Sequence, residues 1–213
     1  MSFKLTIDEG EFLTKLVRQA IVTYLDTSKT IVTPRSTPMK LREKGGVFVT
    51  LNKIANGNDE LRGCIGFPQP DLPLIDATIN AAISAAVHDP RFPPVTSQEL
   101  KNIKVEVSIL TPPKLIEVEN QKDYIKEIKI GQCGLIVERG WFKGLLLPQV
   151  SVEWKWDVEE FLANCCIKAG LSPDMWLIKG TKIYKFSCII ARELAPNGPV
   201  TIVDMQNDDP SKI

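Results

Sequence analysis

The stretch Leu61-Arg62-Gly63-Cys64-Ile65-Gly66 decides the interpretation of this chain, since it combines a strand-forming pattern with an arginine, a thiol and two glycines. Side chains alternate across a strand, so Arg62 and Cys64 are expected on the same face. A guanidinium fixed beside a thiol favours the thiolate, which attacks carbonyl groups and binds metals. The glycines leave space for another backbone or a ligand. The stretch therefore predicts a site on a strand without naming a reaction.

The same stretch forms the second half of a predicted hairpin. Val47, Val49 and Leu51 alternate as a first strand after a pair of glycines. The turn signature Asn56-Gly57-Asn58-Asp59 then leads into the strand that carries Cys64. The hairpin presents the cysteine on regular, rigid backbone.

The remaining pattern alternates between helices and strands. Helical spacing of apolar residues predicts helices over residues 9–25, 73–88 and 157–169, with a short one over 121–128. Alternation predicts further strands over residues 103–109, 134–137, 143–147 and 184–190. Because most neighbouring strands read as hairpins, we expect an α+β fold with a mostly antiparallel sheet and flanking helices.

Composition excludes some classes of function. Lysine plus arginine and aspartate plus glutamate both number 26, so no global field favours strong nonspecific binding to nucleic acid. The most apolar stretch, Leu74 to Val87, is interrupted by Asp76 and Asn80, which argues against a membrane span. The N-terminus lacks the apolar core of a secretory signal, and the five cysteines have no framework spacing. These features predict a cytoplasmic protein with reduced thiols.

Cys64 is the leading candidate for chemistry, and two interpretations of it stay open. Free cysteines are often small, buried and inert core residues. Alternatively, Cys64 is a nucleophile, for which the sole histidine, His88, could act as the base. His88 also suits the end of its helix as a cap. No metal site is predicted, since there is no Cys-x-x-Cys pair and His88 has no partner at ligand spacing.

Four further positions are candidates for ligand binding. Asp89 and Arg91 lie in a loop stiffened by prolines, where they either brace the loop or form a wall of a cleft. Glu106 lies on the polar phase of an apolar strand, so it faces either water or Cys64. Gln149 follows a proline that ends an apolar strand, and its exposed amide either orients a ligand or is simply solvated.

Together these stretches resemble the AMMECR domain family, named after the Alport syndrome and elliptocytosis chromosomal region protein. The matching pieces are Leu61–Gly66, Asp89–Phe92, Glu106–Leu110, Gly134-Leu135, Gly144–Val150 and Lys168–Leu171. The resemblance covers residues 8–195 as one domain and leaves 196–213 as a C-terminal extension, loose at its end. The cysteine hexapeptide is the one piece that indicates the family by itself. The other pieces support the resemblance through their order along the chain.

The resemblance implies a larger and a smaller lobe with a cleft between them, in an intracellular protein without a known cofactor. It also implies two partners, one related to metal-dependent dioxygenases and one a radical S-adenosylmethionine enzyme, and hence a role in a modification pathway. No catalytic residue is established for the family. The residues that transfer as motif positions are Arg62, Cys64, Asp89, Arg91, Glu106 and Gln149.

Two functions are therefore expected. The first is a component of that pathway that binds an unknown small ligand or a partner. The second is an enzyme in which Cys64 is a nucleophile or transient carrier for group transfer or hydrolysis, with Arg62 favouring the thiolate. If a site exists, the motif residues should converge on one cleft, with Cys64 touching a charged residue and reached by solvent.

Overall fold

The computed structural model describes residues 3–55 and 57–208 of the chain. Contacts within the chain divide it into two units, each made of two segments. Unit 1, the larger, comprises Met1–Leu110 and Ile189–Val203. Unit 2 comprises Thr111–Cys188 and Asp204–Ile213.

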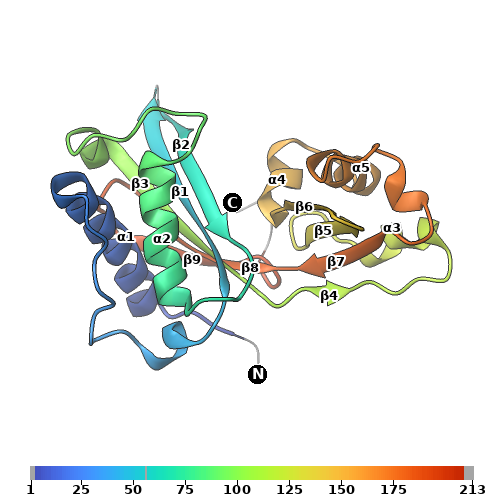
Figure 1. Cartoon of the computed structure of the whole chain (residues 1–213), viewed down its shortest axis with the longest axis horizontal. Coiled ribbons are helices and arrows are strands. Elements are labelled where there is room, and N and C mark those ends of the chain that lie inside the picture. The colour runs from blue at the N-terminus through green and yellow to red at the C-terminus, as the bar shows by residue number, and fades with distance from the viewer. Residues whose placement is uncertain (1–2, 56, 209–213) are drawn as a thin grey trace. The chain divides into compact units, whose positions relative to one another are not determined.

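Unit 1 is built on a five-stranded sheet in the order β2-β1-β3-β8-β9 (Figure 1). Its strands are β1 (Gly46–Ala55), β2 (Asn58–Phe67), β3 (Ile103–Leu110), β8 (Cys188–Glu193) and β9 (Val200–Asp204). β1 is antiparallel to both β2 and β3, so the predicted hairpin is present and β2 forms an edge of the sheet.

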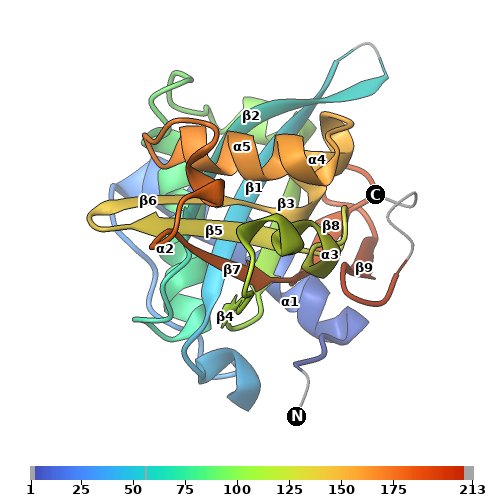
Figure 2. The same cartoon turned by 90° about the vertical axis from the view of Figure 1, so that its right-hand side faces the viewer.

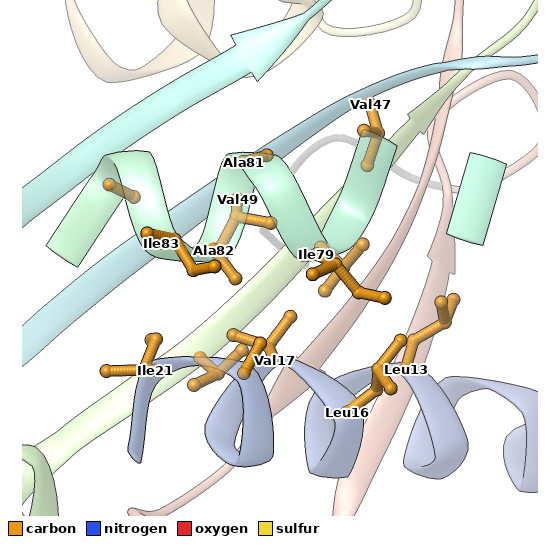
Figure 3. Packing of buried hydrophobic residues seen from close by; sticks show 14 of the residues in the cluster. Leu13, Leu16, Val17, Ile21, Val47, Val49, Ile79, Ala81, Ala82 and Ile83 are labelled. Carbon is orange, nitrogen blue, oxygen red and sulfur yellow. The ribbon is translucent and has the colours of Figure 1, made fainter. Parts of the chain in front are cut away.

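Helices α1 (Ile7–Thr27) and α2 (Leu74–Val87) lie on one face of that sheet, and the short helices η1 (Met39–Arg42) and η2 (Glu99–Asn102) flank it (Figure 1). A capping box between Thr6 and Glu9 starts α1, because each supplies a hydrogen bond that the first helical turn lacks. Figure 3 shows Val17 of α1 facing Ala82 of α2. Both belong to the buried core, where loss of water contact stabilises the fold.

Unit 2 contains a four-stranded sheet in the order β4-β7-β5-β6 (Figure 2). Its elements are β4 (Lys114–Leu115), η3 (Gln121–Asp123), α3 (Tyr124–Glu127), β5 (Gly134–Arg139), β6 (Phe142–Leu146), α4 (Pro148–Glu153), α5 (Val158–Lys168), η4 (Met175–Leu177) and β7 (Lys182–Phe186). A Cβ atom on Gly144 of β6 would lie 2.5 Å from the Ala169 nitrogen. The end of α5 therefore packs on the sheet at backbone distance, which only glycine permits.

The α+β class is confirmed, with antiparallel sheets and flanking helices. The single strand predicted over residues 184–190 is wrong, because β7 and β8 belong to different sheets. Ser187 separates them and exchanges hydrogen bonds of 2.8 Å with Thr111. The alternation of apolar residues continues from β7 through Ser187 into β8, so the sequence pattern does not show where one strand ends and the next begins.

Several elements were not predicted, among them β9 and α4. β9 occupies part of the stretch expected as a C-terminal extension, while residues 209–213, expected to be loose, lie outside the described residues. α4 begins with Pro148, which suits the first turn of a helix because its missing N–H needs no partner there. Within the described chain, no helix has the length and apolar character required to cross a bilayer.

Candidate functional site

Cys64, Thr50 and Glu106 lie in one row across three neighbouring strands. The strand register pairs Thr50 of β1 with Cys64 of β2 and with Glu106 of β3. The Thr50 hydroxyl donates to the Cys64 Sγ at 3.4 Å. Val49 and Leu51, on either side of Thr50, are buried in the core under the helices. Because side chains alternate, the row occupies the sheet face opposite α1 and α2.

The register between β1 and β2 shifts by one residue at Arg62. Leu51 pairs with Gly63, but Asn52 pairs with Leu61, which leaves Arg62 as the extra residue of a β-bulge. The bulge interrupts the simple alternation from which Arg62 and Cys64 were expected to share a face.

The Arg62 side chain, 8% exposed, binds the loop after α2 and η2 instead of the thiol. Its Nε donates to Glu99 Oε1 at 2.5 Å, and its Nη2 donates to the Pro93 carbonyl at 2.9 Å. The guanidinium also lies over the Phe92 ring, 5.8 Å from its centroid. The buried Nη1 has no hydrogen-bond partner among the described residues. The Arg62 guanidinium lowers the pKa of Glu99, which shows where its charge acts.

Asp89 and Arg91 cover the open edge of β2 at Cys64. Asp89 Oδ2 accepts a hydrogen bond from the Cys64 backbone N–H at 2.8 Å. The Cys64 carbonyl accepts one from Arg91 Nη2 at 3.3 Å. The backbone N–H and carbonyl of Cys64, which have no neighbouring strand to bind, are therefore both hydrogen-bonded to side chains. These side chains protect the edge of the sheet at this position.

The Asp89 carboxylate is buried, whereas the Arg91 side chain is 53% exposed. Arg91 Nε and Nη2 donate to the two Asp89 oxygens at 2.9 and 2.7 Å. These bonds, with the backbone N–H groups of Cys64 and Arg91, lower the pKa of Asp89 to about 2. Arg91 Nη1 makes no hydrogen bond to any described residue, so one side of a fixed guanidinium faces outward.

The Cys64 thiol is partly buried, and burial raises its pKa. The Thr50 hydroxyl and the Arg91 charge act in the opposite direction, but burial has the larger effect. The expectation that Arg62 favours the thiolate is wrong, because the Arg62 charge is paired with Glu99. A raised pKa favours the protonated thiol, which is a weak hydrogen-bonding group.

The two glycines of the hexapeptide serve packing. A Cβ on Gly63 would lie 2.1 Å from the Ala85 carbonyl oxygen of α2, and one on Gly66 would lie 2.3 Å from the Phe48 ring. His88 follows α2 at its C-cap, is exposed, and meets the Tyr24 ring edge-on at 6.2 Å between centroids. This placement matches the capping interpretation of His88.

Gln149 belongs to unit 2, where it is the second residue of α4. Its amide is buried, with 7% of the residue exposed, so the expected solvated strand end is wrong at this position. The Gln149 Oε1 accepts a weak hydrogen bond from the Cys188 thiol at 3.8 Å. Convergence of Gln149 with the other motif residues stays a prediction.

The other motif residues are connected within unit 1. Asp89 and Arg91 bind the backbone of Cys64, Glu106 shares the row through Thr50, and Arg62 contacts the Phe92 ring that Arg91 also contacts, at 5.5 Å. Within residues 3–55 and 57–208, no group of three or more histidines, cysteines or carboxylates is arranged to hold a metal ion.

Sequence reasoning missed Thr50 and Glu99. Thr50 could have been found, because it is the polar residue between Val49 and Leu51 of an apolar strand. Glu99 gives no such signal, since it is 37 positions from Arg62 and lies in a polar segment.

Comparisons with known proteins identify the relatives of this chain. The family model AMMECR1 matches residues 14–191. Protein PH0010 of Pyrococcus horikoshii is 56% identical over 201 residues, which is 94% of this chain and 97% of that protein. Protein MK0488 of Methanopyrus kandleri is 53% identical over 209 residues, which is 98% of this chain and all of that protein. A crystal structure of the uncharacterized protein PH0010 superposes with a TM-score of 0.89 and 55% identity, covering 95% of this chain and 100% of that one.

Proposed function

This chain belongs to the AMMECR1 family, and we propose that it is a binding component rather than a catalyst, in which Arg91 holds a carboxylate or phosphate group of a ligand. The observation that carries the proposal is the unequal exposure of the Asp89–Arg91 pair, with Asp89 at 2% and Arg91 at 53%. The buried Asp89 carboxylate holds the Arg91 guanidinium in place through Nε and Nη2 and leaves other N–H donors of Arg91 unused. A cation positioned in this way loses little side-chain freedom when it binds an anion.

The neighbours of Arg91 supply groups that can orient the rest of a ligand. The Cys64 thiol, the Thr50 hydroxyl and the Glu106 carboxylate lie in one row, and Cys64 directly contacts Asp89 and Arg91. A cavity of about 220 Å³ lies at the end of β2 and is lined by Gly66, Phe67, Pro68, Gln69, Asp71 and Leu72. Its mostly apolar wall suits the uncharged body of a small ligand.

The place of this binding step in the cell is part of the same proposal. The resemblance to the AMMECR family supports a cytoplasmic modification pathway that also contains a radical S-adenosylmethionine enzyme and a dioxygenase-like protein. A raised thiol pKa and a histidine that packs on Tyr24 both favour binding over catalysis in this chain.

The test is a titration of the folded protein with inorganic phosphate, citrate and adenosine monophosphate, each matched by sodium chloride at equal ionic strength. An anion that binds the native state at ten times its Kd stabilises the protein by about 1.4 kcal/mol, which thermal unfolding detects. We expect at least one anion to raise the Tm of the wild type and of Cys64→Ser. Arg91→Ala should abolish that rise, and Arg91→Lys should weaken it.

Arg35→Ala is the matched control, since Arg35 is an exposed arginine of the same unit. Equal stabilisation of the wild type and Arg91→Ala, with circular dichroism showing that both are folded, would refute the proposal. Binding lost equally in Arg35→Ala would indicate a nonspecific charge effect and refute it as well.

The alternative is an enzyme that uses Cys64. It is favoured by the Thr50 hydroxyl and the Arg91 charge, both of which lower the pKa of Cys64 against the effect of burial. The pH dependence of iodoacetamide alkylation separates the alternatives. The binding proposal predicts slow alkylation of Cys64 at pH 7 that accelerates only well into the alkaline range, whereas a nucleophile reacts fast near neutrality.

A further inference from the structure

The turn between β5 and β6 in unit 2 presents a fully exposed tryptophan. Arg139 pairs with Phe142, so Gly140 and Trp141 form a two-residue hairpin turn. Gly140 has φ of 58°, a conformation that glycine adopts without strain and that fits the first position of a type II′ turn. Trp141 is 101% exposed in this turn. Figure 2 shows the hairpin of β5 and β6 that the turn closes. An exposed indole on an ordered turn gains nothing for the fold.

Further apolar side chains are exposed on the segments beside the turn. Arg139 Nη1 donates to the Lys179 carbonyl at 3.2 Å and to the Thr181 hydroxyl at 3.0 Å, which joins the turn to the segment before β7. A Cβ on Gly170 would lie 3.6 Å from the Phe142 ring, which joins the turn to the end of α5. The exposed apolar residues on these segments are Trp141, Phe142, Ile167, Leu177 and Ile178, and together we call them the Trp141 surface.

The charges on the same segments are mostly positive. The cations are Arg139, Lys143, Lys168, Lys179 and Lys182. The acidic residues are Asp174, which precedes η4, and Glu138, which lies 3.7 Å from Lys143 and 3.9 Å from Lys182, so the charge of Glu138 is already opposed. A neutral chain thus concentrates positive charge around its most exposed aromatic residue.

We propose that the Trp141 surface docks an acidic segment of a partner protein, with the indole of Trp141 entering an apolar pocket and the surrounding cations pairing with carboxylates of the partner. Tryptophan and arginine dominate the binding energy of protein interfaces, whereas lysines around them act mainly through charge. Three of the five side chains of this surface, Ile167, Leu177 and Ile178, are aliphatic and cannot stack on nucleic-acid bases. The zero net charge of the chain also gives no wider field for RNA or an anionic membrane.

The test begins with a phage-displayed library of random dodecapeptides, selected on the full-length protein and counter-selected on Trp141→Ser. We expect enrichment of peptides that carry several Asp or Glu residues beside a hydrophobic anchor. A fluorescent synthetic peptide of the consensus sequence then gives Kd by anisotropy. Trp141→Ser should weaken binding at least tenfold, and Lys168→Glu with Lys179→Glu should weaken it and flatten its dependence on salt.

Trp154→Ser is the matched control, because Trp154 is another exposed tryptophan of unit 2, 67% exposed and stacked on Trp156 at 5.9 Å. It should leave peptide affinity unchanged. The proposal fails if no enriched peptide depends on Trp141, or if the enriched peptides carry no excess of acidic residues. It also fails if Trp141-dependent binding is found instead for polyuridylate or for vesicles containing 30% phosphatidylglycerol.

Discussion

Two arginine–carboxylate pairs of unit 1 have similar fork geometry but different surroundings. Arg18 of α1 binds both oxygens of Glu193 on β8, at 2.7 and 2.5 Å, and also donates to the carbonyls of Leu100 and Ile103. Glu193 Oε2 further accepts the backbone N–H of Val105 at 3.0 Å. Every nitrogen of the Arg18 guanidinium therefore has a partner in the fold.

The Asp89–Arg91 pair differs in the exposure of its arginine. The Arg91 side chain is 53% exposed, against 13% for Arg18, and its Nη1 has no partner among the described residues. The Arg18–Glu193 pair connects a helix to two strands and has no unused arginine donor, so its contacts all serve the fold. A pair anchored on one side and open on the other leaves donors of its arginine unused, and this difference is the reason why we propose Arg91 as the residue that binds a ligand.

The largest effect is expected for Glu193→Gln. The change leaves the charge of Arg18 buried without its counter-charge, which typically costs about 3–5 kcal/mol. Urea unfolding should show a lower midpoint with an unchanged slope. Glu11→Gln is the control, since Glu11 pairs with Lys15 on the surface of α1 and should lose about 0.5 kcal/mol or less. A loss for Glu193→Gln as small as the control would show that the saturated pair does not stabilise the fold.

Asp89→Asn should have a smaller effect that depends on pH. The pKa of Asp89 is lowered to about 2 in the folded protein, so its stabilisation is present above the pKa of the unfolded chain and is lost as pH falls through about 2. At pH 7 the variant should lose about 2 kcal/mol.

This difference between wild type and Asp89→Asn should shrink between pH 4 and 2, as measured by urea unfolding at each pH. Asp26→Asn, at an exposed position of α1, controls for the general effect of acid. A gap that stays constant down to pH 2 would contradict the lowered pKa.

Arg91→Lys should cost about 1 kcal/mol, because a single ammonium cannot bind both Asp89 oxygens and the Cys64 carbonyl as the guanidinium does. The loss of these bonds should raise the pKa of Asp89, which NMR titration of its carboxyl carbon measures. An unchanged pKa would show that the backbone N–H groups, and not Arg91, control the ionisation of Asp89.

Cys64→Ser should have the smallest effect on stability, within about 0.5 kcal/mol, since Thr50 can donate to the serine oxygen as it does to the thiol. Thermal unfolding provides the measurement. A loss above 2 kcal/mol would mean that the thiol is a packed core group, the inert interpretation that sequence left open.

Local pattern was sufficient for much of this fold, since helical periodicity and alternation located α1, α2, α5, β3 and the two hairpins. Local pattern could not predict the register between β1 and β2. Continuing the pairing of Ala55 with Asn58 along regular strands would put Cys64 opposite Val49, on the core side. The bulge at Arg62 moves Cys64 opposite Thr50, and no residue preference in the sequence announces such a bulge.

The sequence indicated most of the individual residues of the candidate site, but not the contacts that these residues make. The prolines around Asp89 and Arg91 indicated a stiff loop, and the polar phase of Glu106 indicated its face. The partner of Arg62 depends on tertiary packing across 37 positions, so sequence suggested the nearby thiol, whereas the fold supplies Glu99. Gln149 was misplaced for a related reason, because a proline that ends a strand can equally begin a buried helix turn.

The position of β8 between β3 and β9 has a consequence for synthesis on the ribosome. Residues 1–110 emerge first, yet the sheet of unit 1 lacks two strands until residues 189–203 have also emerged. Until then Arg18 has no Glu193 to bind. Most of unit 2 lies between these two segments and is translated before the second of them. Unit 2 can therefore fold before unit 1 is complete. A nascent chain that stops at residue 188 therefore carries a unit 1 with an open sheet edge, the state most exposed to chaperones and to aggregation.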